Sequence, residues 1–430
     1  MNQPDRIRKS VLNGGLRVLT ETIRTVRSLS VGIWVKTGSR YERDPEAGIT
    51  HFLEHMLFKG TDQRSAYDIA LSMESVGGYL NAFTSPELTC YYARCLDSEL
   101  DTALDVLTDM VLHSRFPEEE IEKEKKVVIE EMKMYRDNPE DYVFEEFNKQ
   151  LFMPHPLGRP IIGYESTVSS FTRENLFSYM KEHYQPANII IAVAGNAEHE
   201  KVLALVNKYF QPLESVRREP LDLPLTPYES SRVSLSRPIE QTHLIVGRRA
   251  ISATDPDRFK LLLANTVLGS GMSSRLHQNI REKYGYCYHV NSFMESFRDI
   301  GLFGIYAGTD RNYVRHVREL ILAELRRLRE ELIPEKELDE AKSQLKGKLL
   351  LAQESMSNRM TRLAKSEIFY DRYITMDELV GEIDGAEARQ IRDLCETFFD
   401  ENQFAETVLA PRDPSGEEAD GSDPKEKGSN

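Results

Sequence analysis

The chain is poor in cysteine and tryptophan, with four cysteines and one tryptophan among 430 residues. None of the cysteines has the spacing of a zinc ribbon. Cys90 and Cys95 are five positions apart in a strand-like run, so their side chains point to opposite faces and do not readily pair. We therefore expect free thiols, as in a reducing compartment, and no disulfide framework.

Long apolar runs are also missing. The longest aliphatic run, residues 189–194, suits a buried strand. A membrane-spanning helix needs about 20 apolar residues, which excludes this run. Residues 1–13 contain no continuous apolar segment of the kind found in a signal peptide. The sequence therefore predicts a cytoplasmic protein with no membrane partner.

Positive charge is in deficit: 55 Lys and Arg stand against 70 Asp and Glu, for a net charge of −15. This argues against nucleic-acid binding, which usually needs a basic face. An acidic interior that attracts basic peptides would fit the charge, but solubility alone also explains it. Residues 412–430 hold six acids and three bases without a large apolar residue, which predicts a disordered acidic tail.

Two halves of the chain follow one plan. In each half, strands and a helix are followed by an amphipathic helix, a proline turn and a charged helix. Residues 116–125 and 333–342 agree best, because each places proline at a helix start and acids in the first turn. We predict an α+β fold with two similar domains, each an antiparallel-rich sheet with helices packed on it, arranged like a clam shell.

The amphipathic helices carry apolar side chains at helical spacing, which indicates core packing. The first stripe comprises Leu100, Ala103, Leu104, Leu107, Met110 and Val111. The second stripe comprises Val317, Ile321, Leu325, Leu328 and Leu332. Between the halves, prolines 220, 224 and 227 among charged residues indicate a linker. The predicted division is an N-terminal domain 1–215, a linker 216–231, a C-terminal domain 232–411 and the tail 412–430.

His51, Glu54 and His55 form the strongest chemical signal. Residues i and i+4 of a helix lie on one face, about 6 Å apart along the axis, so both histidines can bind one Zn²⁺. Glu54 lies about 60° around the helix from His51, where it can reach a water without being a ligand. This His-x-x-Glu-His order is the inverzincin motif. With ten histidines in the chain, a chance pair is the competing interpretation.

A catalytic zinc needs a third protein ligand, for which the adjacent Glu130 and Glu131 compete. Glu130 shares its helix face with lysines, which indicates a solvated face. The face of Glu131 also carries Glu124, Val127, Val128 and Tyr135. Carboxylates on a largely apolar face need a partner or a metal. We therefore predict Glu131 as the ligand and Glu124 as an acid that orients a ligand or the attacking water. Pairing of Glu124 with a buried arginine is the alternative.

These residues resemble the pitrilysin/insulinase family of zinc metallopeptidases, most closely the branch of the mitochondrial processing peptidase and its bacterial relatives. Residues 51–55 match the family motif, Glu131 lies at the family spacing, and Glu124 matches the family's further acid. The resemblance covers roughly residues 5–410, including the two-half plan. It implies a zinc-dependent endopeptidase that hydrolyses extended or unfolded peptides, with Glu54 as the general base.

The second half has lost the metal-binding side chains. Residues 261–265 replace the histidine motif, and Lys348 replaces Glu131 in the register of the two prolines that begin the charged helices. We therefore expect one zinc ion per chain.

The resemblance also implies that a strand binds the substrate. Residues 77–84 indicate a turn leading into a strand whose partner is 90–93. At Asn81, Ala82 and Phe83 the strand edge would take up an extended peptide as an added strand. An ordinary hairpin is the alternative.

Arg281 and Tyr288 resemble the family's arginine and tyrosine near the scissile bond. Arg281 would hold a substrate carbonyl, and Tyr288 would donate to the developing oxyanion. Judged without the resemblance, Arg281 is a solvated helix charge and Tyr288 a half-buried strand aromatic.

The family chamber has four domains of this type and the chain supplies two. We therefore expect a homodimer in which Arg281 and Tyr288 of one chain serve the zinc of the other. A non-catalytic assembly subunit of a two-subunit peptidase is one alternative, and the intact motif argues against it. A metal hydrolase for a non-peptide substrate is another.

Overall fold

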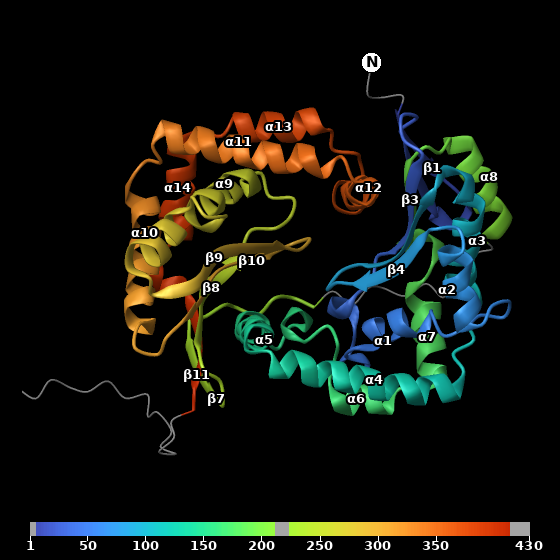
Figure 1. The fold of residues 1–430 in the computed structure, drawn as a ribbon, viewed down its shortest axis with the longest axis horizontal. Helices are drawn as coiled ribbons and strands as arrows, with labels where there is room; N and C mark the ends of the chain where they lie inside the picture. Colours follow the sequence, from blue (N-terminus) through green and yellow to red (C-terminus); the bar gives the residue numbers. More distant parts are fainter. Residues whose placement is uncertain (1–5, 211–222, 413–430) are drawn as a thin grey trace, which may run out of the picture.

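The computed structural model describes residues 6–210 and 223–412, which form two lobes built on one sheet each (Figure 1). The strand order of the first sheet is β1-β2-β6-β3-β5-β4, and that of the second is β7-β11-β8-β10-β9. Most neighbours are antiparallel, and the parallel pairs are β2 with β6 and β7 with β11. The first sheet comprises β1 (Ile7–Val11), β2 (Arg17–Thr22), β3 (Ser28–Val35), β4 (Tyr79–Thr84), β5 (Thr89–Leu96) and β6 (Ile189–Gly195). The second comprises β7 (Arg232–Arg237), β8 (Thr242–Ala250), β9 (Cys287–Ser296), β10 (Gly301–Thr309) and β11 (Ala405–Pro411).

The helices of the two halves occur in a similar order along the chain. Those of the first half are α1 (Ile49–Met56), α2 (Ala66–Glu74), α3 (Leu100–His113), α4 (Glu118–Asp137), α5 (Pro139–Phe152), α6 (Glu165–Ser170), α7 (Arg173–His183) and α8 (His199–Tyr209). Those of the second half are α9 (Arg258–Gly269), α10 (Val314–Glu330), α11 (Glu335–Ala352), α12 (Met356–Tyr370), α13 (Met376–Asp384) and α14 (Ala388–Phe398). Pro117 and Pro334 occupy the N-caps of α4 and α11. The predicted α+β class and two-domain plan are confirmed.

The apolar patterns predicted from the sequence identify most of the core residues correctly. Every residue of β6 is buried, in agreement with the strand predicted at 189–194. All six residues of the α3 stripe are buried, as are four of the five in the α10 stripe. The fifth, Leu332, is 54% exposed. It lies beyond the end of α10 at Glu330, so helical periodicity no longer applies to it.

Each lobe is covered in part by a helix from the other half of the sequence. Helix α12, from the second half, packs on β2, β3 and β6 of the first lobe (Figure 1). Its Met360 and Leu363 share a buried cluster with Trp34. Helix α5 packs on β8 and β11, where Phe147 joins a cluster with Ile245. Because both sheets need a helix from the other half to bury their second face, the two halves form one connected structure.

Residues 216–222 of the predicted linker and 413–430 of the predicted tail lie outside the described residues, as do 211–215 at the end of the predicted N-terminal domain. Residues 223–231 form no helix or strand, and Leu225 and Tyr228 pack against the cluster between α5 and the second sheet. All four cysteines are free and buried. Within the described ranges, no helix is long and apolar enough to cross a membrane. The cytoplasmic location stays a prediction.

Candidate metal centre

The start of α1 is held by backbone and carboxylate contacts. Gly48 occupies the N-cap with a φ of 93°, and a Cβ there would lie 2.5 Å from the Ile162 carbonyl oxygen. The buried Glu42 carboxylate accepts hydrogen bonds from the N–H groups of Gly48 and Thr50, at 2.8 and 2.9 Å. Helix N-termini leave N–H groups without partners in the helix, so this carboxylate satisfies two donors and fixes the direction of α1.

Helix α1 separates an apolar face from a polar one. The buried apolar residues are Ile49, Phe52, Leu53 and Met56. The residues that α1 presents to a cavity of about 550 Å³ are His51, Glu54 and His55. The predicted helical spacing is therefore realised, with the histidine rings one turn apart and 4.6 Å between centroids.

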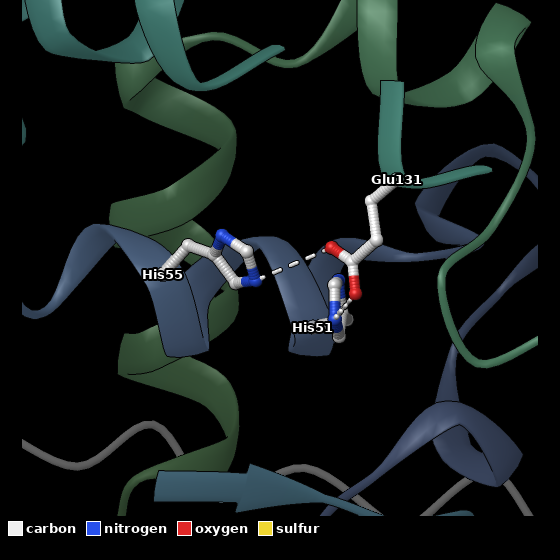
Figure 2. A group of neighbouring side chains, drawn as sticks. All are labelled: His51, His55 and Glu131. Atoms are coloured by element: carbon white, nitrogen blue, oxygen red, sulfur yellow. Dashed lines mark ion pairs between the residues drawn. The ribbon is translucent and has the colours of Figure 1, made fainter. Parts of the chain in front are cut away.

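Glu131 of α4 meets both histidines (Figure 2). Its Oε1 lies 3.9 Å from His51 Nε2, and its Oε2 lies 3.7 Å from His55 Nε2. One ligand atom from each of the three residues lies within 4.8 Å of the others, and no other such group occurs in 6–210 or 223–412. A zinc ion sits about 2.0–2.2 Å from nitrogen and oxygen ligands, so it fits among these atoms. Glu131 Oε2 is buried without a hydrogen-bond partner, which also suits a cation.

Glu124 contacts His55 at Nδ1, the ring nitrogen that does not face Glu131. The Glu124 carboxylate is only 3% exposed, and its Oε1 lies 2.8 Å from His55 Nδ1. Its Oε2 lies 2.6 Å from Lys59 Nζ. Burial raises the pKa of Glu124, but the hydrogen bonds of His55 and Lys59 lower it further, and the result is below the usual value. When Nδ1 donates to Glu124, Nε2 of His55 keeps its lone pair for a metal.

Lys59 was missed by the sequence argument, which considered a buried arginine as the alternative partner of Glu124. The available signal was its position four residues after His55, although Lys59 lies just beyond the end of α1 at Met56. The structure combines the two interpretations, because Glu124 contacts both a predicted ligand and a basic residue.

The electrostatics of the cavity favour neutral histidine at position 51. Burial, together with the proximity of His55, lowers the pKa of His51 to about 3. A neutral imidazole is the form that binds a metal. Burial raises the pKa of Glu54, and Thr84 and His55 partly offset this rise.

The face of α4 differs in part from the prediction. Glu130 is exposed and pairs with Lys133 at 2.6 Å, as expected for a solvated face. The prediction that Val127 belongs to the apolar face is wrong, since it is 50% exposed. The buried stripe of α4 is Ile121, Glu124, Val128 and Met132. Glu131 and Tyr135 lie at the edge of this stripe, where they line the cavity.

The predicted strand at Asn81, Ala82 and Phe83 is β4, at the edge of the first sheet. It pairs with β5 in the register Asn81↔Tyr92, Ala82↔Tyr91 and Phe83↔Cys90, as expected. Among the described residues no strand pairs with its other edge. The Ala82 N–H donates to Asn81 Oδ1 at 2.8 Å, and Phe83 lines the cavity. The β4 edge therefore runs beside the candidate metal centre.

Arg281 and Tyr288 do not line the cavity. Arg281 Nη1 lies 2.7 Å from His277 Nε2, and its guanidinium lies 5.4 Å from the centroid of the Tyr288 ring. Tyr288 is 80% exposed, which excludes a half-buried strand aromatic. Glu295, seven residues further along β9, does line the cavity. At about 3.3 Å per residue, Tyr288 stands roughly 23 Å from it along the strand.

Residues 223–412, the part of the second half that the structure describes, contain no equivalent centre. Residues 261–265 lie in α9, most of them buried. Lys348 of α11 donates to Ser270 Oγ at 2.9 Å. Three further acids line the cavity and were missed by the sequence argument: Asp141, Glu145 and Glu295. The first two lie four residues apart on α5, a helical spacing visible in the sequence.

Comparison with known proteins agrees with this architecture. The family model of insulinase (peptidase family M16) matches residues 17–165, and the model of the peptidase M16 inactive domain matches residues 170–345. The uncharacterized zinc protease YmxG of Bacillus subtilis is 39% identical over 94% of this chain and 98% of its own length. The uncharacterized zinc protease SCO5738 of Streptomyces coelicolor is 39% identical over 88% of this chain and 84% of its own length.

Solved structures show the same fold. The crystal structure of a protease from Helicobacter pylori has a TM-score of 0.88 at 23% identity, covering 94% of this chain and 99% of that one. A peptidase M16 inactive-domain structure from Pseudomonas fluorescens has a TM-score of 0.86 at 20% identity, covering 94% and 98%. Together with the sequence identity to the zinc proteases, these matches show that the chain belongs to peptidase family M16, the insulinase family.

Proposed function

We propose that this protein is a zinc-dependent endopeptidase that hydrolyses peptide bonds in extended or unfolded peptides, with one zinc per chain. The observation that carries the proposal is the convergence of His51, His55 and Glu131 beside Glu54, in a cavity bordered by a strand edge. The zinc proteases among its relatives support it.

The predicted metal ligands, Glu54 and Glu124 each have a chemical task in this proposal. His51, His55 and Glu131 would hold the zinc ion, which would supply a Lewis acid for the activation of water and the polarisation of a carbonyl. Glu54 takes the proton of the attacking water and passes it to the leaving amine. Glu124 holds His55 in the orientation and tautomer that a ligand needs.

The surroundings of the centre suit a basic, extended peptide. The free edge of β4 offers backbone groups with which an extended chain can pair as an added strand. Asp141, Glu145 and Glu295 add negative charge to the cavity beyond the predicted site residues. Opposite charge favours basic side chains in such a cavity.

We expect the purified protein to cleave fluorogenic peptides with basic residues faster than matched peptides with acidic residues. A chelator should abolish cleavage because it removes the zinc ion that the proposed reaction needs as its Lewis acid. Added zinc should restore cleavage. A zinc-loaded protein that cleaves no peptide would instead favour the non-catalytic assembly subunit. Hydrolysis confined to non-peptide substrates would favour a metal hydrolase that does not act on peptides.

We also propose that two chains form a homodimer in which Arg281 and Tyr288 of one chain complete the site of the other. Their position outside the cavity of their own chain supports action in trans. There, Arg281 would hold a substrate carbonyl and Tyr288 would donate to the oxyanion.

Complementation of two inactive variants tests the homodimer. Glu54→Gln chains mixed with Arg281→Ala/Tyr288→Phe chains should regain activity, up to about one intact composite site per mixed dimer. The physical reason is that a mixed dimer joins an intact zinc site to an intact Arg/Tyr pair. Light scattering and a subunit-exchange assay serve as controls. A monomer at working concentration would contradict the homodimer. Subunit exchange without recovered activity would contradict composite sites that are formed by two chains and act independently of each other.

A further inference from the structure

Arg40 is a buried arginine that joins the two halves of the chain. It lies in the short 3-10 segment Ser39–Tyr41 after β3 and is 2% exposed. Its Nη1 and Nη2 donate to the two carboxylate oxygens of Asp299 at 2.6 Å each, and Nη1 also donates to Glu87 at 2.7 Å. Asp299 belongs to the second half, and Glu87 to the first. Parallel bonds to one carboxylate fix orientation as well as distance.

These contacts connect two turns. Glu87 lies in the turn between β4 and β5, and Asp299 lies in the turn between β9 and β10. The Glu87 carboxylate also accepts the N–H of Arg298, at 3.0 and 3.2 Å. The Arg40 N–H donates to the Pro86 carbonyl oxygen at 2.8 Å. Arg40 therefore holds the first turn through backbone and side chain, and the second turn through Asp299.

The same two turns, together with the strand ends beside them, line the cavity next to the candidate metal centre. Thr84 and Pro86 line it from the first half, and Glu295 and Phe297 line it from the second. A Cβ on Gly38 would lie 2.1 Å from the Ser85 carbonyl oxygen, so the segment that carries Arg40 rests directly on the β4–β5 turn. A shift of the β9–β10 turn would therefore change the space next to the β4 edge.

We propose that Arg40 is a positioning residue that ties the β9–β10 turn to the β4–β5 turn and thereby sets the width of the cavity at the β4 edge. The consequence for peptide binding rests on the proposed function, whereas the tie between the turns does not. Replacing Asp299 with asparagine leaves a single neutral amide oxygen where two charged oxygens accept from Nη1 and Nη2 of the buried Arg40, so the parallel pair of charged hydrogen bonds is lost. The β9–β10 turn should then become more mobile than the β4–β5 turn, because Asp299 is the residue through which Arg40 holds it.

Hydrogen exchange measured by mass spectrometry tests the tie without any assay of activity. In Asp299→Asn, peptides covering residues 294–301 should exchange at least about fivefold faster than in the wild type, and the Arg298 amide should be among the affected sites. Peptides from α1 should exchange at the wild-type rate, and zinc content should not change. Asp299 is 41% exposed in its side chain, so this variant is expected to fold. Asp299→Glu, which keeps the charge, should restore most of the protection.

A matched control removes a similar pair inside one half. Arg275 is 8% exposed, and its Nε and Nη2 donate to Glu337 at 2.8 and 2.7 Å, with both residues in the second half. Glu337→Gln should leave exchange at residues 294–301 unchanged. Unchanged exchange in Asp299→Asn, or an equal increase in Glu337→Gln, would overturn the tie.

Peptidase kinetics then test the consequence for the cavity. Asp299→Asn should raise KM about tenfold and change kcat less than threefold, because the walls move while the metal ligands and Glu54 stay in place. Glu337→Gln should keep the wild-type KM. A fall in kcat with unchanged KM would overturn the role in cavity width. A wild type without peptidase activity would count against the proposed function, while the exchange experiment would still decide the tie.

Discussion

Replacing Glu54 with glutamine is expected to lower kcat at least about a hundredfold while zinc stays bound. A positioned general base contributes roughly 10²–10⁴-fold to rate, and glutamine cannot take a proton from water. The three ligand residues are unchanged in this variant, so metal affinity should persist. Steady-state kinetics on a fluorogenic peptide and metal analysis of the same sample measure both quantities.

Glu74→Gln is the matched control for this experiment. Glu74 ends α2 in the same lobe, and its side chain is exposed and lies outside the cavity. Its loss should leave both rate and zinc unchanged. A Glu54→Gln rate within tenfold of the wild type would show that another group acts as the base. The same inactive variant should retain bound peptides, and their identification by mass spectrometry would define the substrate.

Glu131→Gln is expected to lose most of the zinc and nearly all activity, whereas Glu130→Gln should keep both. The two residues are neighbours in sequence, but Glu131 lies beside the histidine nitrogens and Glu130 pairs with Lys133 at the surface. A neutral amide is a weaker ligand for Zn²⁺ than a carboxylate, and two histidines alone leave the site with too few ligands.

Elemental analysis after dialysis, followed by a peptidase assay with added zinc, distinguishes these variants. Glu130→Gln is the matched control for Glu131→Gln, because it makes the same chemical change one residue away on the same helix. Zinc loss in Glu130→Gln with retention in Glu131→Gln would mean that the wrong face of α4 was assigned to the metal.

Local periodicity was enough to predict much of the candidate site. Residues four apart on a helix must share a face, so His51 and His55 could be paired before any fold was known. The same reasoning separated Glu131 from Glu130, because α4 buries one stripe and solvates the opposite one. It was less accurate at the stripe's edge, where Val127 turned out to be exposed. A residue near the boundary of a face is buried or exposed according to its neighbours, which periodicity does not describe.

The tertiary structure decided which faces meet. An apolar stripe shows that a helix packs against something, but not against what, so the exchange of α5 and α12 between the halves was not foreseen. For the same reason, the contact between Lys59 and Glu124, which comes from another helix, was not foreseen.

The sequence by itself determined the α+β class, the duplicated plan, the histidine pair with ligand spacing and the face of α4 that carries Glu131, since these follow from composition, repetition and helix geometry within short segments. Only the tertiary structure brought Arg40 to Asp299 and set Tyr288 apart from the cavity. Contacts between residues far apart in the chain depend on how whole sheets and helices pack. A single sequence records the propensity of each segment but not the partner against which it folds.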